Sequence, residues 1–262
     1  MKLSLSLSYR LLAFTMALVW GVAALGCLAS AAPRPQKKEK EHEGKNIDSG
    51  SFGVFLNGRR VGTETFSIDQ TGSGSVIRSE FKTDNAATPA VQNSELQLTA
   101  AGEIQRYEWK ELSPEQAELQ VLPNDDFLTQ KSRSGPQGKE HEQPYLLSLS
   151  TSILDDYFFI HREVLAWKFL ATACKQEKGQ LQCPIKQHTQ FATLNPHEQA
   201  SASLDAEFIG REKVALKTGQ RELFKLEFKT DAGTWQLWLD EHDQFKLMRI
   251  SILGENTAVE RD

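Results

Sequence analysis

Two cysteines are the residues of this sequence whose spacing most clearly predicts chemistry. A two-residue turn centred on Lys178-Gly179 pairs Lys175 with Gln182 and then Cys174 with Cys183. The cysteines become a non-hydrogen-bonded pair, whose Cα atoms approach to roughly 4.5 Å, close enough for a disulfide. A longer loop with Gly179 in the left-handed conformation would also bring them together. We therefore expect a structural Cys174–Cys183 disulfide, formed in an oxidising compartment.

His161 follows two acidic residues, Asp155 and Asp156, and could in principle serve a hydrolase. On one helix, offsets of five and six residues place these carboxylates on other sides than the histidine. We expect His161 to be a buried histidine with a hydrogen-bond partner. A hydrolase that uses Asp155, Asp156 or His161 is accordingly the least favoured function, and we assign no catalytic residue.

Metal and cofactor sites lack a recognisable pattern in this sequence. His188, His197 and His242 stand alone, without the H-x-x-x-H or H-E-x-x-H spacing of zinc sites. The acidic turn at 240–243 lacks the glycine and distal glutamate of a calcium loop, which favours a solvated hairpin tip. No G-x-S-x-G, Walker or dinucleotide fingerprint occurs. The expectation is a protein without enzymatic activity, metal or cofactor.

A single long helix is predicted over residues 152–170. Ser152 with Asp155 three residues later forms a capping-box variant, and acids in the first turn suit the helix dipole. The apolar face is wide and calls for an enclosing surface. The residues at helical spacing, which are candidates to line a ligand cavity, are Leu154, Phe158, His161 and Leu165.

The segments on both sides of this helix read as short strands separated by turns. Asn57-Gly58 predicts a type I′ hairpin. In a two-residue hairpin Val54 and Phe66 would fall on opposite faces, so either Gly62 marks a bulge or both faces are covered. Roughly a dozen strands around one helix indicate a mainly β protein. We expect a curved antiparallel sheet, or unclosed half-barrel, with the helix packed on its concave face.

The N-terminal region predicts export. Residues 1–31 combine Lys2 and Arg10 with an apolar run and a small-residue cleavage site, the parts of a signal peptide. Alternatively, Cys27 ends a lipoprotein box and is acylated; an uncleaved membrane anchor is a weaker third reading. Residues 32–50 should be a disordered charged linker, and residues 51–262 one domain. The protein would be periplasmic, or membrane-anchored if Cys27 is acylated.

The charge balance excludes a typical nucleic-acid binder. Of 30 basic residues, Lys2 and Arg10 leave with the signal peptide, so 28 remain against 35 acidic residues, a net charge of −7. A protein that binds phosphate backbones would show a basic excess or stripe. The one basic cluster, at 37–40, is interleaved with glutamates and reads as solvated linker.

Four segments carry a resemblance to a known family. The run NGRRVGTETFSI, the segment ILDD, the pair WLDEHDQFKLMRI and the terminal VERD resemble bacterial envelope proteins of a family without assigned function, built on a curved antiparallel sheet. At the level of fold that family is similar to the half-barrel of Lol-type lipoprotein carriers. The resemblance implies fold and compartment, and by analogy an acyl-chain ligand between sheet and helix.

Two non-enzymatic functions are therefore favoured over a hydrolase. In the first, an envelope protein binds an apolar ligand, such as a lipid, an acyl chain or a lipoprotein, between sheet and helix, in a cavity of roughly 300 Å³ or more. In the second, a structural or assembly protein acts through an exposed apolar patch or an unpaired sheet edge. Contact with a membrane is expected only if Cys27 is acylated.

Overall fold

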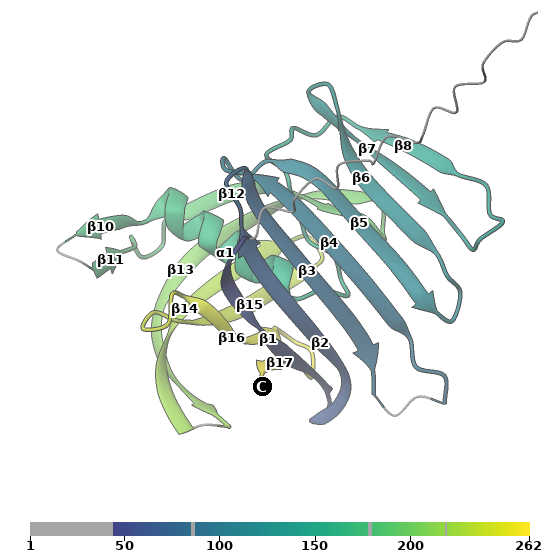
Figure 1. Ribbon diagram of the computed structural model, residues 1–262. Helices are drawn as coiled ribbons and strands as arrows, with labels where there is room; N and C mark the ends of the chain where they lie inside the picture. Colours follow the sequence, from purple (N-terminus) through teal and green to yellow (C-terminus); the bar gives the residue numbers. More distant parts are fainter. Residues whose placement is uncertain (1–43, 85–86, 178–179, 218) are drawn as a thin grey trace, which may run out of the picture. The chain divides into compact units, whose positions relative to one another are not determined.

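The computed structural model describes residues 44–84, 87–177, 180–217 and 219–262 (Figure 1). The predicted signal peptide at 1–31, Cys27 and most of the predicted linker lie outside the described residues. Within them the chain is mainly β, with one α-helix, as predicted.

One large sheet contains 15 strands in the order β8-β7-β6-β5-β4-β3-β2-β1-β17-β16-β15-β14-β13-β12-β9. The described pairings are antiparallel apart from the parallel pair of β9 with β12. No described pairing joins the two ends of this order, so the sheet is unclosed. The strands of its first half are β1 (Lys45–Leu56), β2 (Arg59–Gln70), β3 (Gly74–Thr83), β4 (Val91–Thr99), β5 (Ile104–Ser113), β6 (Glu118–Asn124), β7 (Phe127–Arg133) and β8 (His141–Tyr145). Those of the second half are β9 (Ser152–Ile153), β12 (His188–Asn195), β13 (Ala200–Leu216), β14 (Gly219–Thr230), β15 (Gly233–Asp240), β16 (Lys246–Ile252) and β17 (Thr257–Arg261).

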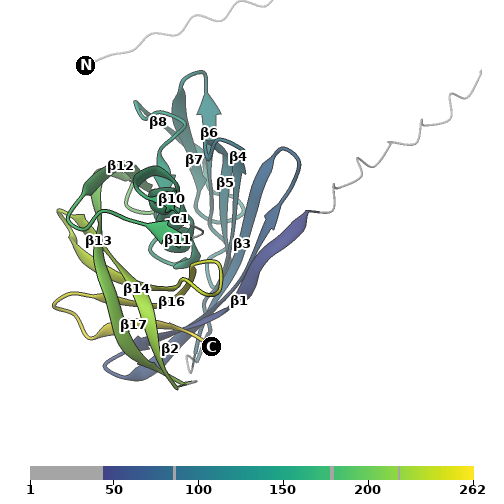
Figure 2. The same ribbon diagram turned by 90° about the vertical axis from the view of Figure 1, so that its left-hand side faces the viewer.

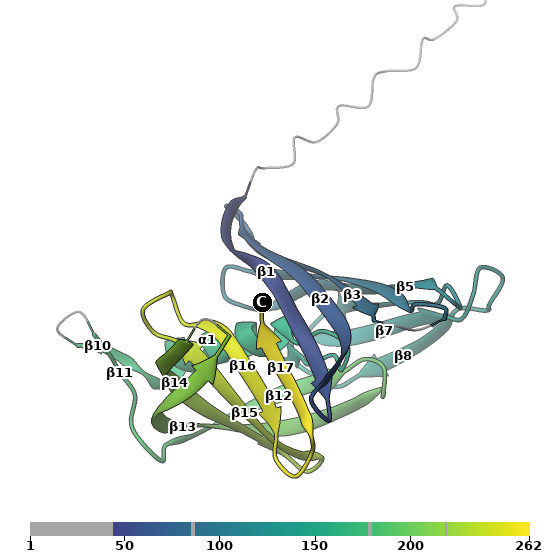
Figure 3. The same cartoon turned by 90° about the horizontal axis from the view of Figure 1, so that it is seen from below.

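Most pairings join strands that are consecutive in the sequence, which short turns allow. Asn57 and Gly58 both have positive φ, 52° and 75°, and Leu56 pairs with Arg59 across them, so the predicted hairpin is confirmed. A register shift between Val54 and Phe55 supplies the bulge. The exceptions are the parallel pair of β9 with β12 and the pairing of β1 with β17 (Figure 3), in which Val54 faces Val259.

The predicted helix boundaries are wrong at the start. Helix α1 spans Ile160–Ala173, and Ser152 lies in β9 instead of capping a helix. The carboxylate of Asp155 accepts the backbone N–H of Tyr157 in a turn that precedes the helix. The residue before the helix, Phe159, supplies no side-chain cap. The local capping pattern was overridden by tertiary contacts.

The predicted domain boundary also needs correction. Strand β1 begins at Lys45, which pairs with Gln70, so residues 45–50 belong to the sheet and not to a linker. Asp48 is only 3% exposed and forms ion pairs with Arg261 and Lys246. A charged residue of the predicted linker thus forms ion pairs within the fold.

Helix α1 contacts strands from both halves of the sheet order (Figure 2). The ring of His161 lies 5.6 Å from that of Tyr107 on β5. Next to it, the Arg162 guanidinium lies 3.8 Å from the ring of Trp235 on β15. Leu165, Ala166 and Phe169 are buried, so the helix belongs to the core.

A first prediction concerns Phe158, which is completely buried just before α1. Phe158→Ala should lower the free energy of unfolding by about 3–5 kcal/mol, because it removes a large core side chain and leaves a cavity. Urea unfolding measures this. The matched control is Leu112→Ala at a position that is 50% exposed, which should change stability by less than about 0.5 kcal/mol. A loss that small for Phe158→Ala would mean that this segment is only loosely attached.

Candidate functional site

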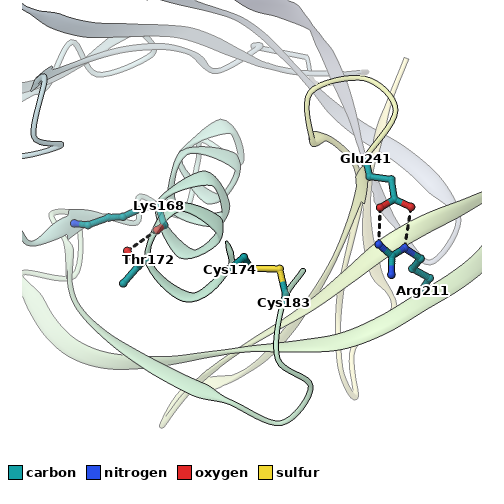
Figure 4. The surroundings of a disulfide bond; sticks show 6 residues. All are labelled: Lys168, Thr172, Cys174, Cys183, Arg211 and Glu241. Atoms are coloured by element: carbon teal, nitrogen blue, oxygen red, sulfur yellow. Dashed lines mark hydrogen bonds and ion pairs between the residues drawn. A yellow bond between two sulfur atoms is a disulfide. The ribbon is translucent and has the colours of Figure 1, made fainter. Parts of the chain in front are cut away.

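The C-terminal end of α1 is fixed by the predicted disulfide (Figure 4). Cys174 and Cys183 are bonded, with Cα atoms 4.3 Å apart. Between them β10 (Lys175–Glu177) and β11 (Gln180–Gln182) pair in the expected register, Lys175 opposite Gln182. The backbone N–H of Cys174 also donates to the carbonyl of Leu170 at 3.1 Å, so the staple is continuous with the helix.

The N-terminal end of α1 is held by a carboxylate from another element. Glu64 of β2 is completely buried, and its Oε2 accepts the backbone N–H of Phe159 at 2.7 Å. Its Oε1 accepts the N–H of Ile160 at 3.3 Å and the hydroxyl of Ser79 at 2.7 Å. Burial raises the pKa of Glu64 to about 7, although these three hydrogen bonds act to lower it.

A second buried carboxylate, that of Glu163, attaches the first turns of α1 to strand β16. Oε2 of Glu163 accepts the backbone N–H of Leu247 on β16 at 3.0 Å. Burial, and then the nearby carboxyl of Asp48, raise the pKa of Glu163 well above its usual value. Asp48 is paired with Arg261, whereas no described cation lies at ion-pair distance from Glu163, so it is the pKa of Glu163 that rises.

The segment before α1 carries a buried polar cluster around Asp155. Its Oδ2 accepts the hydroxyl of Tyr107 and lies 2.8 Å from Nε2 of His197. Burial alone would raise the pKa of Asp155, but the interactions with His197, His161 and Tyr107 outweigh it and lower the pKa. Trp109 and Tyr157 pack edge-on against the His197 ring, at 4.5 and 4.8 Å.

His197 has no partner at metal-ligand spacing in the sequence, but in the structure it lies 2.8 Å from Asp155. Asp155 and His197 are far apart in the chain, so no spacing rule could pair them. Asp156, in contrast, is exposed and accepts a hydrogen bond from Asn195. Asp155 and His161 both contact Tyr107, whose hydroxyl donates to Asp155 and whose ring lies 5.6 Å from that of His161. The cavity that His161 lines, however, includes neither aspartate.

That cavity lies between α1, β4 and the β4–β5 turn and has a volume of about 470 Å³. Its buried lining is mainly apolar, with Leu96 on β4, Ile153 on β9 and Leu165 on α1. It reaches the surface near Ala101 and Ala171, which are exposed. On the helix, the lining residues follow one face: His161, Val164, Leu165, Lys168 and Ala171.

The cavity is also lined by polar side chains, those of Gln70, Thr151, Ser152, His161 and Lys168. His161 is 1% exposed and neither ring nitrogen has a hydrogen-bond partner among the described residues. Burial lowers its pKa to about 4, so the imidazole is neutral at pH 7. The Thr151 hydroxyl, also 1% exposed, likewise has no described partner. Lys168 is half-buried and donates to the Ser150 carbonyl at 2.5 Å.

Two of the four residues predicted to line a ligand cavity lie in the lining of this one. His161 and Leu165 line the cavity, whereas Leu154 and Phe158 do not. Because α1 begins eight residues later than predicted, Leu154 and Phe158 precede the helix and are not on its cavity face. No sequence pattern predicted that β4 and Lys168 contribute to the lining.

Another hollow, of about 530 Å³, lies over β2–β5 but has a different character. Its lining is largely polar and charged, including Arg78, Glu80, Glu95 and Lys110. The ion pair of Arg78 with Glu95 crosses it at 2.8 Å. It reads as a solvated face of the sheet, so the cavity beside α1 is the candidate site.

The other predicted polar features have structural partners. In the acidic turn, Asp240 pairs with Arg221 and Glu241 with Arg211, the latter drawn in Figure 4. Within the described ranges, no group of three or more His, Cys, Asp or Glu side chains is placed to hold a metal ion. No helix in the described part of the chain is long and apolar enough to cross a membrane.

Comparison of the chain with protein-family models, with curated proteins and with solved structures gives no match.

A second prediction follows from the opposite pKa shifts of Glu64 and His161. Glu64 binds its proton more tightly in the folded state, so its contribution to the free energy of unfolding falls between pH 4.5 and about 7. His161 binds its proton less tightly when folded, so its contribution rises between about pH 4 and 6.5. Each shift corresponds to about 3 kcal/mol, and the two nearly cancel.

Substitution should separate the two contributions. In Glu64→Gln, stability should rise with pH relative to wild type across pH 4.5–7, on top of a constant loss because an amide cannot accept all three hydrogen bonds. In His161→Phe, stability should fall with pH relative to wild type across pH 4–6.5. Urea unfolding at several pH values measures both, and differences from wild type remove the contributions of other groups. A difference that does not depend on pH would contradict the assignment.

Proposed function

We propose that this protein is an exported, non-enzymatic binding protein that holds an apolar ligand, such as a lipid or acyl chain, in the cavity between α1 and β4. The observation that carries the proposal is the mainly apolar cavity of about 470 Å³. Small-molecule sites are typically roughly 300–1,000 Å³ and combine apolar walls with a few polar groups.

The unpartnered polar atoms inside the cavity support a ligand. The ring nitrogens of His161 and the hydroxyl of Thr151, buried in the same lining, have no hydrogen-bond partner among the described residues, which costs free energy unless something else bonds to them. A ligand that carries an oxygen atom supplies such a partner. Purely structural packing would leave the cavity filled by side chains.

Contacts between distant strands favour a sheet that curves around α1, as in a half-barrel with the helix on its concave face. In the sheet order, β5 and β15 are seven steps apart, which in a flat sheet is roughly 33 Å. Tyr107 of β5 and Trp235 of β15 nevertheless contact the adjacent residues His161 and Arg162. A curved sheet accounts for both contacts and encloses one wall of the cavity.

The compartment is inferred from two features. The pattern at 1–31 is that of a signal peptide, and the Cys174–Cys183 disulfide is typical of proteins in oxidising compartments. We place the protein in the bacterial envelope on this basis. Processing at Cys27 would add a lipid anchor, and residues 32–44 would act as its spacer.

A second candidate function is assembly through the outer surface. Leu146 is 87% exposed directly after β8, and among the described residues β8 pairs on one side only, with β7. Unpaired edges and exposed apolar side chains are features of interaction surfaces. This function does not use the cavity, so filling the cavity would leave it intact.

A third prediction tests the proposed function by filling the cavity. Val164→Phe adds volume at a lining position of α1. It should weaken binding of N-phenyl-1-naphthylamine, an uncharged apolar dye, by about tenfold or more, which is about 1.4 kcal/mol. Fluorescence titration measures the dissociation constant. The matched control, Leu112→Phe at an exposed site, should bind like wild type.

Two outcomes would contradict the proposal. Wild-type protein that does not bind the dye at all would remove ligand binding. Equal affinity of Val164→Phe, Leu112→Phe and wild type, with all three folded by circular dichroism, would place the binding elsewhere.

A further inference from the structure

Lys168 is the cationic group at the mouth of the cavity. Its ammonium donates to the Ser150 carbonyl at 2.5 Å and to the Ser152 hydroxyl at 3.3 Å. No described carboxylate lies at ion-pair distance from it. Burial lowers the pKa of Lys168, and the charge of Glu103 acts in the opposite direction without a direct contact.

Thr151 lies between the two residues that Lys168 contacts, and it lines the same cavity. Its hydroxyl is buried and unpartnered among the described residues. An ammonium and a hydroxyl that line the same cavity, the hydroxyl having no partner among the described residues, are complementary to the oxygens of an anionic group. Phe191, whose ring lies 5.8 Å from the Lys168 ammonium, provides an apolar flank.

Other cavity-lining residues of α1 lie N-terminal to Lys168. Val164 and Leu165 lie one turn before Lys168, and His161 lies seven residues before it, about 10 Å along the helix axis. The cavity thus has a cationic, partly exposed end at Lys168 and a buried end at His161. Apolar side chains line the space between them.

We propose that the ligand is a single-chain amphiphile whose anionic head group binds Lys168 and Thr151 at the mouth, with its alkyl chain along Val164 and Leu165. This rests on the proposed function and adds the class of ligand. A carboxylate and a phosphate monoester share the chemistry that these two side chains recognise.

Displacement of N-phenyl-1-naphthylamine by ligands of equal chain length tests the head group. For wild type, dodecanoate and dodecyl phosphate should displace the dye at concentrations at least about tenfold lower than dodecanol, and dodecyltrimethylammonium should be the weakest. A stronger effect of dodecanoate supports a fatty acid, and a stronger effect of dodecyl phosphate supports a phospholipid product. Dodecanol as effective as both anions would overturn the head-group assignment while leaving the proposed function in place. Failure of all four to displace a bound dye would overturn both.

Substitutions at the mouth of the cavity should change only the preference for anionic over uncharged ligands. Lys168→Gln should abolish the preference for dodecanoate over dodecanol, and Thr151→Val should reduce it, while the affinity for dodecanol stays within about twofold of wild type. Glu103→Gln should increase the preference, because it removes a negative charge near Lys168. The control is Lys213→Gln, at an exposed position of β13. An unchanged preference in Lys168→Gln, with dodecanol affinity intact, would refute the role of Lys168.

Discussion

The carboxylate of Glu64 beneath the first turn of α1 is the interaction on which the rest of this structure depends. The N–H groups of a helix start have no partners within the helix, and burying them unpaired is costly. Glu64 satisfies those of Phe159 and Ile160 and ties them to Ser79 of β3 through the same carboxylate. Desolvation opposes this arrangement, which is why the pKa of Glu64 is raised to about 7. The position of the cap fixes where the helix begins, and hence which of its residues face β4.

The other attachments of α1 make it a fixed wall of the cavity. Glu163 binds the backbone of β16, Arg162 lies over Trp235, and the Cys174–Cys183 disulfide holds the far end. These contacts involve the first turn of α1, one of its sides and its C-terminal end. The face that carries His161, Val164 and Lys168 is the one that lines the cavity. A preformed wall of this kind lowers the ordering cost of binding a ligand.

Local chemistry was predictable from the sequence, and long-range polar contacts were not. The Asn57-Gly58 turn and the Cys174–Cys183 hairpin depend on residues close in the chain, and both were predicted correctly. The helix start was predicted from Ser152, a local capping signal, but the actual cap comes from β2. One sequence signal was overlooked: Glu64 alternates with Phe66 and Ile68, so it had to lie on the buried face of its strand.

The candidate site was predicted only in outline for the same reason. His161 and Leu165 were found because they follow the helical period. Leu96 on β4 and Thr151, just before β9, reach the cavity from segments that no periodicity connects to α1. The contact of Asp155 with His197 and Tyr107 joins three separate segments. Such contacts become visible only once the sheet order is known.

Native mass spectrometry of the protein, purified from its native cells without detergent, detects any molecule that the cavity holds. We expect one amphiphile with an anionic head group bound per chain, present in wild type and in Leu112→Phe but absent from Val164→Phe. A wild-type chain that carries no bound molecule, and gains none when an envelope lipid extract is added, would contradict it.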